Sequence, residues 1–106
     1  MLYLYATIWL HLVKMNSNES YIFKALADST RCLIMDELFE NNKQTLYELT
    51  ARLIMKHNIT ISRQAIAKHI TILENAGLIH SEKQGKYRLL IFNNEPIKNI
   101  TKRWLK

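Results

Sequence analysis

Apolar residues recur at helical spacing along most of the chain. They occupy two consecutive turns between residues 19 and 27, and a wider sector between residues 30 and 40. Asp28 and Ser29, which stand between the two stretches, are residue types that cap helix N-termini. We therefore predict a short helix over 19–27 and a second helix over 30–40, whose wide apolar sector is buried on several sides.

Two stronger helix-start signals follow. Thr45 and Glu48 have the spacing of a capping box, which predicts a helix that begins there and ends near residues 56–58. Ser62 is the N-cap candidate for a helix over 63–75, which has the cleanest periodicity in the chain. One face of this helix is polar, and the opposite face is apolar and is expected to be buried. The apolar face consists of Ile66, Ile70 and Leu73.

The pattern changes after Gly77, which is suited to end that helix. Two β-prone runs, 78–83 and 87–92, flank a three-residue loop over 84–86 that contains glycine. Such a pattern predicts a β-hairpin. Pro96 then marks the first turn of a last helix. The apolar stripe of that helix consists of Ile97, Ile100 and Trp104.

This order of elements defines the predicted fold class. It is mainly α with a small β-hairpin: a winged helix-turn-helix, flanked by N- and C-terminal helices that are available for dimerisation. Only two glycines and one proline occur in 106 residues, which fits helices with short connections. We assign residues 15–106 to one winged helix-turn-helix DNA-binding domain.

Residues 1–14 differ from the rest of the chain because they are almost wholly apolar. The run is shorter than the roughly 20 residues that a membrane helix needs, and it lacks the basic start of a signal peptide. Three interpretations stay open: an extension from a misplaced start codon, a first helix buried in a dimer, or a membrane contact. A single cysteine, Cys32, allows no intrachain disulfide. We expect a cytoplasmic protein without a membrane partner.

The charge balance favours a polyanionic partner. The formal net charge is +6 and the pI is about 9.6, which makes nucleic acid the first candidate. Paired carboxylates at a useful spacing and glycine-rich phosphate loops are absent from the sequence. Its four histidines lack a second ligand at helical spacing; they are His11, His57, His69 and His80. We therefore expect neither an enzyme nor a metal site, and no cofactor.

The helix over 63–75 is the candidate recognition helix. Its outer face carries no carboxylate before Glu74, and its polar side chains can pair with base edges in the major groove. The hairpin, as a wing over 79–91, adds cations suited to the DNA backbone or the minor groove. The alternative for each element is an ordinary solvated surface. The candidate DNA-binding residues are Ser62, Arg63, Gln64, Ala67, Lys68, His69, Thr71, Lys83, Gln84, Lys86 and Arg88.

Two subunits are expected to pair through the terminal helices, because a chain this small cannot easily cover their apolar stripes alone. The candidate interface residues are Tyr21, Ile22, Ile97, Ile100 and Trp104. The partners predicted from the sequence are thus double-stranded DNA and a second copy of the chain.

Three stretches together resemble the ArsR/SmtB family of winged-helix regulators. They are KALADSTR over 24–31, SRQAIAKHI through LENAGLI over 62–79, and GKYR over 85–88. The resemblance implies DNA binding and dimerisation. We interpret the protein as a homodimeric repressor or autoregulator of transcription. The connection over 54–61 is several residues longer than in the family. Thr45 and Tyr47 stand about where the family's metal sensors have a Cys-x-Cys pair, which argues against metal sensing there.

Two alternatives remain beside the repressor. Cys32 lies inside an apolar helix and is interpreted as a small packed hydrophobe, but a regulator switched by a ligand or by oxidation of this thiol would use it differently. The second alternative is a winged helix that docks on proteins and does not bind DNA.

Overall fold

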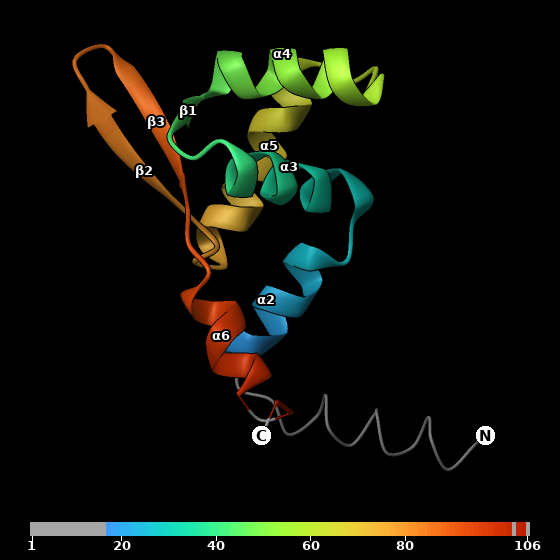
Figure 1. The fold of residues 1–106 in the computed structure, drawn as a ribbon, viewed down its shortest axis with the longest axis vertical. Helices are drawn as coiled ribbons and strands as arrows, with labels where there is room; N and C mark the ends of the chain where they lie inside the picture. The colour runs from blue at the N-terminus through green and yellow to red at the C-terminus, as the bar shows by residue number, and fades with distance from the viewer. Residues whose placement is uncertain (1–16, 103, 106) are drawn as a thin grey trace.

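Figure 1 shows a computed structural model of the protein, which describes residues 17–102, 104 and 105. The predicted fold class, mainly helical with a winged helix-turn-helix, is confirmed. The interpretations of residues 1–14 lie outside the described residues. In chain order the elements are α2 (Ser17–Leu26), α3 (Ser29–Glu40), β1 (Gln44–Thr45), α4 (Leu46–His57), α5 (Arg63–Asn75), β2 (Ile79–Gln84), β3 (Tyr87–Phe92) and α6 (Glu95–Thr101).

The helices begin where their capping residues predict. The Asp28 carboxylate accepts a hydrogen bond from the Arg31 amide at 3.0 Å, at the start of α3. Thr45 and Glu48 form the complete capping box of α4. The Ser62 hydroxyl accepts from the Ala65 amide at 3.1 Å, so α5 begins at the predicted residue. These local bonds fix the N-terminal ends of the three central helices.

The sheet has one strand more than the sequence suggested. Its order is β1-β3-β2, all antiparallel, whereas a two-stranded hairpin was predicted. β1 is only two residues long, too short to show the alternation of a strand. Its Gln44 is buried, and the side-chain amide donates to the Glu37 carbonyl at 3.2 Å and to the Asn41 carbonyl at 2.6 Å.

The hairpin turn is also tighter than predicted. Gln84 pairs with Tyr87, so the loop has two residues and the predicted three-residue loop over 84–86 was wrong. Gly85 takes a φ of +60°, a conformation that costs glycine little. The wing is therefore a regular two-stranded ribbon up to its tip.

The core lies where α3, α4, α5 and the base of the sheet meet. The predicted inner face of α5 is buried there, which confirms that part of the periodicity. Below this core, α2 and α6 pack against each other at the opposite end of the molecule from α4 (Figure 1). The fully buried large apolar residues are Ile34, Leu38, Leu49, Leu53, Ile66, Leu73, Leu78 and Ile79.

The last helix is shorter than its apolar stripe suggested. α6 has Pro96 in its first turn, as predicted, but it ends at Thr101. Trp104 lies beyond it, so the predicted helical stripe that reached Trp104 was wrong at its C-terminal end. α4, by contrast, ends as expected, with Asn58 in the left-handed conformation at a φ of +51°. No helix in the described part of the chain has the length and apolar content to cross a membrane.

Candidate nucleic-acid interface

The outer face of α5 presents the polar side chains that its periodicity assigned to it. Gln64, Lys68 and Thr71 are exposed, as is Arg63 in the first turn. Ala67 lies between them, half-buried, and its carbonyl accepts the Thr71 hydroxyl at 3.1 Å. A small residue in the middle of this face lets the helix approach a partner closely. The hydroxyl of Ser62 is occupied as the helix cap.

The only carboxylate on α5 is paired with the wing. Glu74 Oε2 accepts from Arg88 Nη2 on β3 at 3.2 Å, and Arg88 remains 68% exposed. This ion pair compensates the negative charge of Glu74 and connects the wing to α5. Arg88 therefore belongs to both elements of the interface.

Two neighbouring hollows lie between α5, α4 and the wing. A small recess of about 130 Å³ is lined by Ala67 and Thr71 of α5, Leu46 of α4 and Arg88 of β3, among others. Leu46 and Arg88 also line a larger cleft of about 610 Å³, between the N-terminus of α4 and the wing. Two of the α5 candidates, Ala67 and Thr71, are thus brought close to Arg88 of the wing.

The larger cleft contains two residues that the sequence analysis missed. Tyr47 on α4 and Tyr87 on β3 both line it and are 70% and 58% exposed. Lys86 Nζ lies 5.6 Å from the centre of the Tyr87 ring, a cation–π distance. The sequence alone could not show that these tyrosines line a cleft, because the cleft depends on the pairing of β1 with β3.

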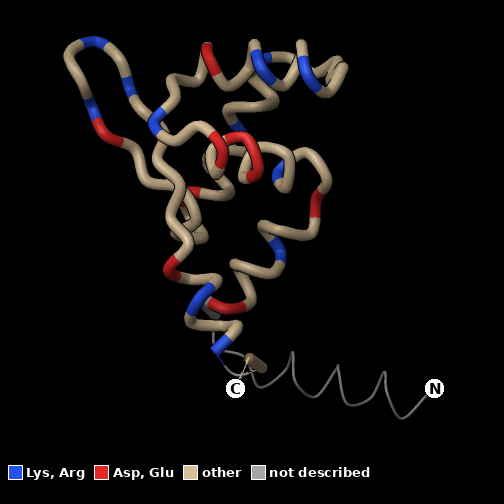
Figure 2. The backbone as a smooth tube through the Cα atoms, viewed as in Figure 1, with Lys and Arg blue, Asp and Glu red and all other residues tan. Residues whose placement is uncertain are grey.

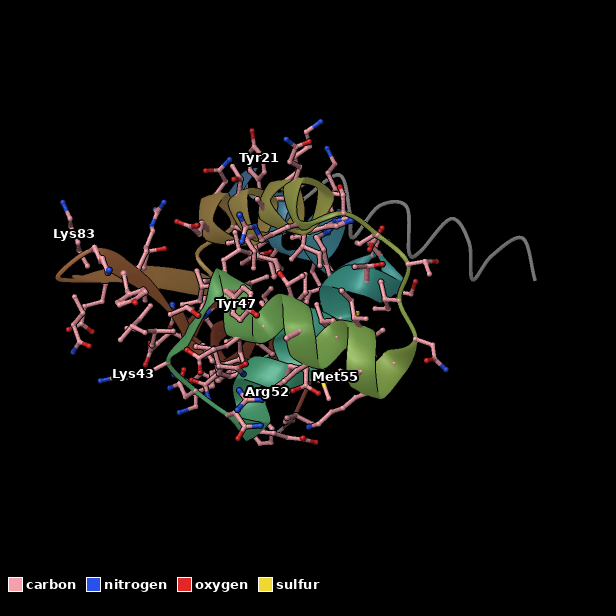
Figure 3. All side chains as sticks on the ribbon, turned by 90° about the horizontal axis from the view of Figure 1, so that it is seen from above. Tyr21, Lys43, Tyr47, Arg52, Met55 and Lys83 are labelled. Atoms are coloured by element: carbon pink, nitrogen blue, oxygen red, sulfur yellow. The ribbon has the colours of Figure 1, made fainter. Side chains whose placement is uncertain are left out.

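The tip of the wing is polar and carries cations. Lys83, Gln84 and Lys86 are exposed. Figure 2 shows several lysine and arginine positions along the hairpin of β2 and β3. Viewed from above, Lys83 projects from the wing well away from the helical body (Figure 3). These side chains can reach a partner that also touches α5.

Comparison with known proteins agrees with this geometry. No protein-family model matches the chain. The HTH-type transcriptional regulator YuzN of Bacillus subtilis is 64% identical over 91 residues, which are 86% of this chain and 99% of YuzN. The arsenical resistance operon repressor of Bacillus subtilis is 31% identical over 78 residues, 74% of this chain and 69% of that protein. An ArsR-like transcriptional regulator from Rhodococcus sp. RHA1 superposes with a TM-score of 0.70 at 30% identity, over 82% of this chain and 76% of that one.

The chain belongs to the ArsR family of helix-turn-helix transcriptional regulators. The resemblance found in the sequence is thereby confirmed. The family is one of transcriptional regulators and not of enzymes.

One predicted DNA-binding residue of this ArsR-family regulator points into the protein. His69 is half-buried on α5, and its Nδ1 lies 3.1 Å from Arg31 Nη1 on α3. Asp28 stands beside the pair. The hydrogen bond from the Arg31 backbone amide, followed by the charge of Arg31 and by that of His69 when it is protonated, outweighs desolvation and lowers the pKa of the Asp28 carboxyl below its usual value of 3.8.

The interpretation of Cys32 as a packed hydrophobe was wrong. Its side chain is exposed, and Sγ lies 3.1 Å from the Leu26 carbonyl, to which it donates. The buried face of α3 contains Ile34 and Leu38. Cys32 lies two residues before Ile34, about 200° away around the helix, so it faces outward. Phe39 is likewise 72% exposed, so the apolar sector of α3 is buried only in part.

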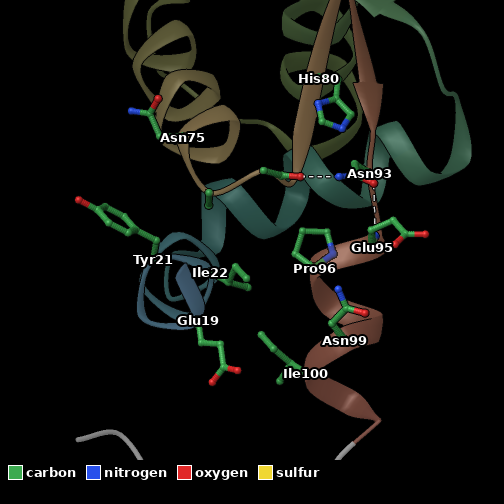
Figure 4. Close-up of a pocket in the computed structure, with 12 residues that line it drawn as sticks. Glu19, Tyr21, Ile22, Asn75, His80, Asn93, Glu95, Pro96, Asn99 and Ile100 are labelled. Carbon is green, nitrogen blue, oxygen red and sulfur yellow. Dashed lines mark hydrogen bonds between the residues drawn. The ribbon is translucent and has the colours of Figure 1, made fainter. Parts of the chain in front are cut away.

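The predicted dimer residues divide into two groups. Ile22 and Ile100 are buried, and they point toward each other across a hollow of about 470 Å³ between α2, α6 and the base of the hairpin (Figure 4). Ile97 is half-buried against the same core. Tyr21 and Trp104 are more than half exposed, and the Trp104 ring lies 6.5 Å from that of Phe23.

Acidic residues of α3 pair with basic residues at the end of α4. Glu37 on α3 is buried, and its Oε1 lies 3.3 Å from Lys56 Nζ and 3.3 Å from His57 Nε2 on α4. These contacts join α3 to the end of α4. Among the described residues no group of three histidine, cysteine or acidic side chains is placed to hold a metal ion.

Proposed function

We propose that this ArsR-family regulator is a sequence-specific, homodimeric DNA-binding repressor of the cytoplasm. Helix α5 enters the major groove, and the wing over 79–91 lies on the backbone or in the minor groove. Residues 15–106 form the DNA-binding domain. The relative that is an arsenical resistance operon repressor supports repression as the regulatory outcome.

The observation that carries this proposal is the charge of the α5 face. Its one carboxylate, Glu74, is paired with Arg88, while Arg63 and Lys68 project from the same helix. A polyanion that approaches α5 therefore meets cations and neutral polar groups. The wing adds the exposed cations Lys83 and Lys86, beside one exposed carboxylate, Glu82.

Three side chains on the outer face of α5 have matching partners among the DNA bases. Gln64 can pair with adenine and Lys68 with guanine, and the Ala67 methyl can contact that of thymine. The wing lysines and Arg88 suit phosphates, which position the protein without reading sequence. Base recognition is thus assigned to α5 and backbone binding to the wing.

The proposed homodimer would use the end of the molecule that carries α2 and α6. Tyr21, Trp104 and Leu105 are exposed there, and exposed aromatic and aliphatic groups of this kind mark interfaces. Two α5 helices could then read half-sites about one helical turn apart.

Selection from a random-sequence duplex library provides the test. We expect an enriched sequence, bound at least about 10³-fold more tightly than random duplex. Its affinity should fall steeply as salt rises, because bound phosphates release counterions. The absence of both enrichment and salt-dependent binding would reject the proposal and favour a winged helix that docks on proteins.

A further inference from the structure

The guanidinium of Arg31 connects three helices. Its Nε donates to the Ala25 carbonyl at 2.6 Å and its Nη2 to the Lys24 carbonyl at 3.2 Å, both in the last turn of α2. Its Nη1 lies 3.1 Å from Nδ1 of His69, in the middle of α5. The side chain itself belongs to α3 and is only 13% exposed. One partly buried cation thus contacts both the end of α2 and the candidate recognition helix.

This contact requires a neutral His69. A guanidinium has donors and no acceptor, so Nδ1 must accept and the ring proton must reside on Nε2. Protonation of His69 would place a second donor and a second positive charge against Arg31. The contact between α3 and α5 would then become repulsive.

One acidic group faces the pair. Asp28 Oδ2 lies 3.9 Å from Arg31 Nη1, and the carboxyl remains ionised in mild acid because its pKa is lowered. Asp28 also interacts electrostatically with His69, so its attraction would act on both side chains if His69 were protonated. Asp28 cannot restore the lost hydrogen bond, because His69 with two ring N–H groups has no acceptor for Arg31.

We propose that Arg31 and His69 form a protonation-sensitive link that positions α5 relative to α2, and through α2 relative to the proposed dimer seam. Both are positioning residues for DNA binding, so the inference rests on the proposed function. α2 carries the exposed Tyr21 and packs on α6, so a shift of α5 against α2 changes the placement of both recognition helices in a dimer. Sequence-specific binding, which needs both helices in register, is the property that protonation lowers.

Two variants of His69 distinguish loss of the hydrogen-bond acceptor from gain of a ring proton. In His69→Asn, the side-chain oxygen can occupy the place of Nδ1 and accepts at every pH, and asparagine and histidine have similar helix propensities. His69→Leu removes the acceptor altogether. The remaining histidines are the same in all three proteins, so they cancel in the comparison.

The measurement is the ratio of affinities for the selected duplex and for random duplex, at fixed salt, at about pH 8 and about pH 5.5, which span the range in which imidazoles titrate. We expect the wild-type ratio to fall about ten-fold on acidification, the order of one hydrogen bond to a charged group. His69→Asn should keep a high ratio at both pH values, and His69→Leu a low one. A wild-type ratio that does not change, or an equal fall in His69→Asn, overturns the inference.

A second readout needs no DNA. At about pH 8 the ring ¹⁵N shifts of His69 should show a bare Nδ1 and a protonated Nε2, because Arg31 donates to Nδ1. A ring that carries its proton on Nδ1 overturns the link. If the wild type binds no duplex at any pH, the proposed function fails, whereas these shifts still decide whether the link exists. Melting curves of the three proteins verify that each is folded.

Discussion

The two ends of this ArsR-family protein expose different sets of side chains and share one core. At the α5 and wing end, most exposed side chains are polar or cationic, although Ile72, Tyr47 and Tyr87 are exposed there too. At the α2 and α6 end, Tyr21, Trp104 and Leu105 remain exposed although smaller apolar neighbours are buried. The proposed DNA-binding surface and the proposed dimer surface therefore lie at different places on one small domain. Substitutions at either end, or in the core between them, test this division.

The largest effect should come from the core, which both ends share. Ile70→Asp places a carboxylate where the side chain is 4% exposed, and we expect the domain to unfold because the charge has no partner there. Ile72→Asp is the matched control on the same helix, since Ile72 is 42% exposed. Circular dichroism should show loss of helix only in the first variant. Equal melting temperatures for the two would mean that the inner face of α5 is misassigned.

The next largest effect should be on self-association. Trp104→Ala should weaken a dimer by about 2–4 kcal/mol, since buried aromatic anchors dominate interface energies. Sedimentation should show a shift toward monomer, with helix content retained. Tyr47→Ala removes an exposed aromatic residue from the other end and should leave the dimer intact. A wild type that sediments as a monomer would contradict the assignment of this end.

Lys68→Ala tests base recognition at the α5 end. The loss of a base contact should cost about 1–3 kcal/mol of specific binding, while the melting temperature stays nearly unchanged because Lys68 is exposed. Lys98→Ala removes an exposed cation of α6 and should leave specific binding nearly unchanged. Measuring the affinities of both variants for selected and random duplex shows which of the two ends contacts the bases. Identical losses in both variants would make the effect one of net charge alone.

The wing should contribute to salt dependence more than to specificity. Lys83→Ala with Lys86→Ala should flatten the log–log slope of affinity against salt by about 1–2 units, since each phosphate contact adds about 0.9. The matched control replaces Lys98 and Lys102, two exposed cations at the far end. A slope that changes only in the control would place the DNA backbone at α6.

The smallest effect should be a pH dependence of stability at the junction of α2 and α3. Because the folded pKa of Asp28 lies below 3.8, its ionised form contributes stability that is present above that value and is lost as pH falls through the folded pKa. Asn caps helices about as well as Asp, so Asp28→Asn should remove mainly the charge contribution. Melting temperatures of the two proteins should differ at neutral pH and converge in acid. A difference in melting temperature that widens in acid would contradict a lowered pKa of Asp28 in the folded protein.

Local chemistry in the sequence was enough to place the central helices. Caps at Asp28, Thr45 and Ser62 are decided by bonds within three residues, so reading them requires no knowledge of the fold. β1 was missed because a two-residue strand exists only through its pairing with β3. The Arg31–His69 contact spans 38 positions in the sequence, and no spacing rule reaches that far. The exposure of Cys32 likewise depends on which face of α3 the core covers.

Amide chemical-shift mapping with the selected duplex tests the division between the two ends most directly. The account predicts that the largest shifts fall on residues 62–71 of the recognition helix and 83–88 of the wing, with small shifts over 97–101. Lys68→Ala should reduce the shifts around Lys68 and leave those at the wing tip. Shifts concentrated on α6, or the same small change throughout the described chain, would contradict the assignment of α5 as the helix that reads DNA.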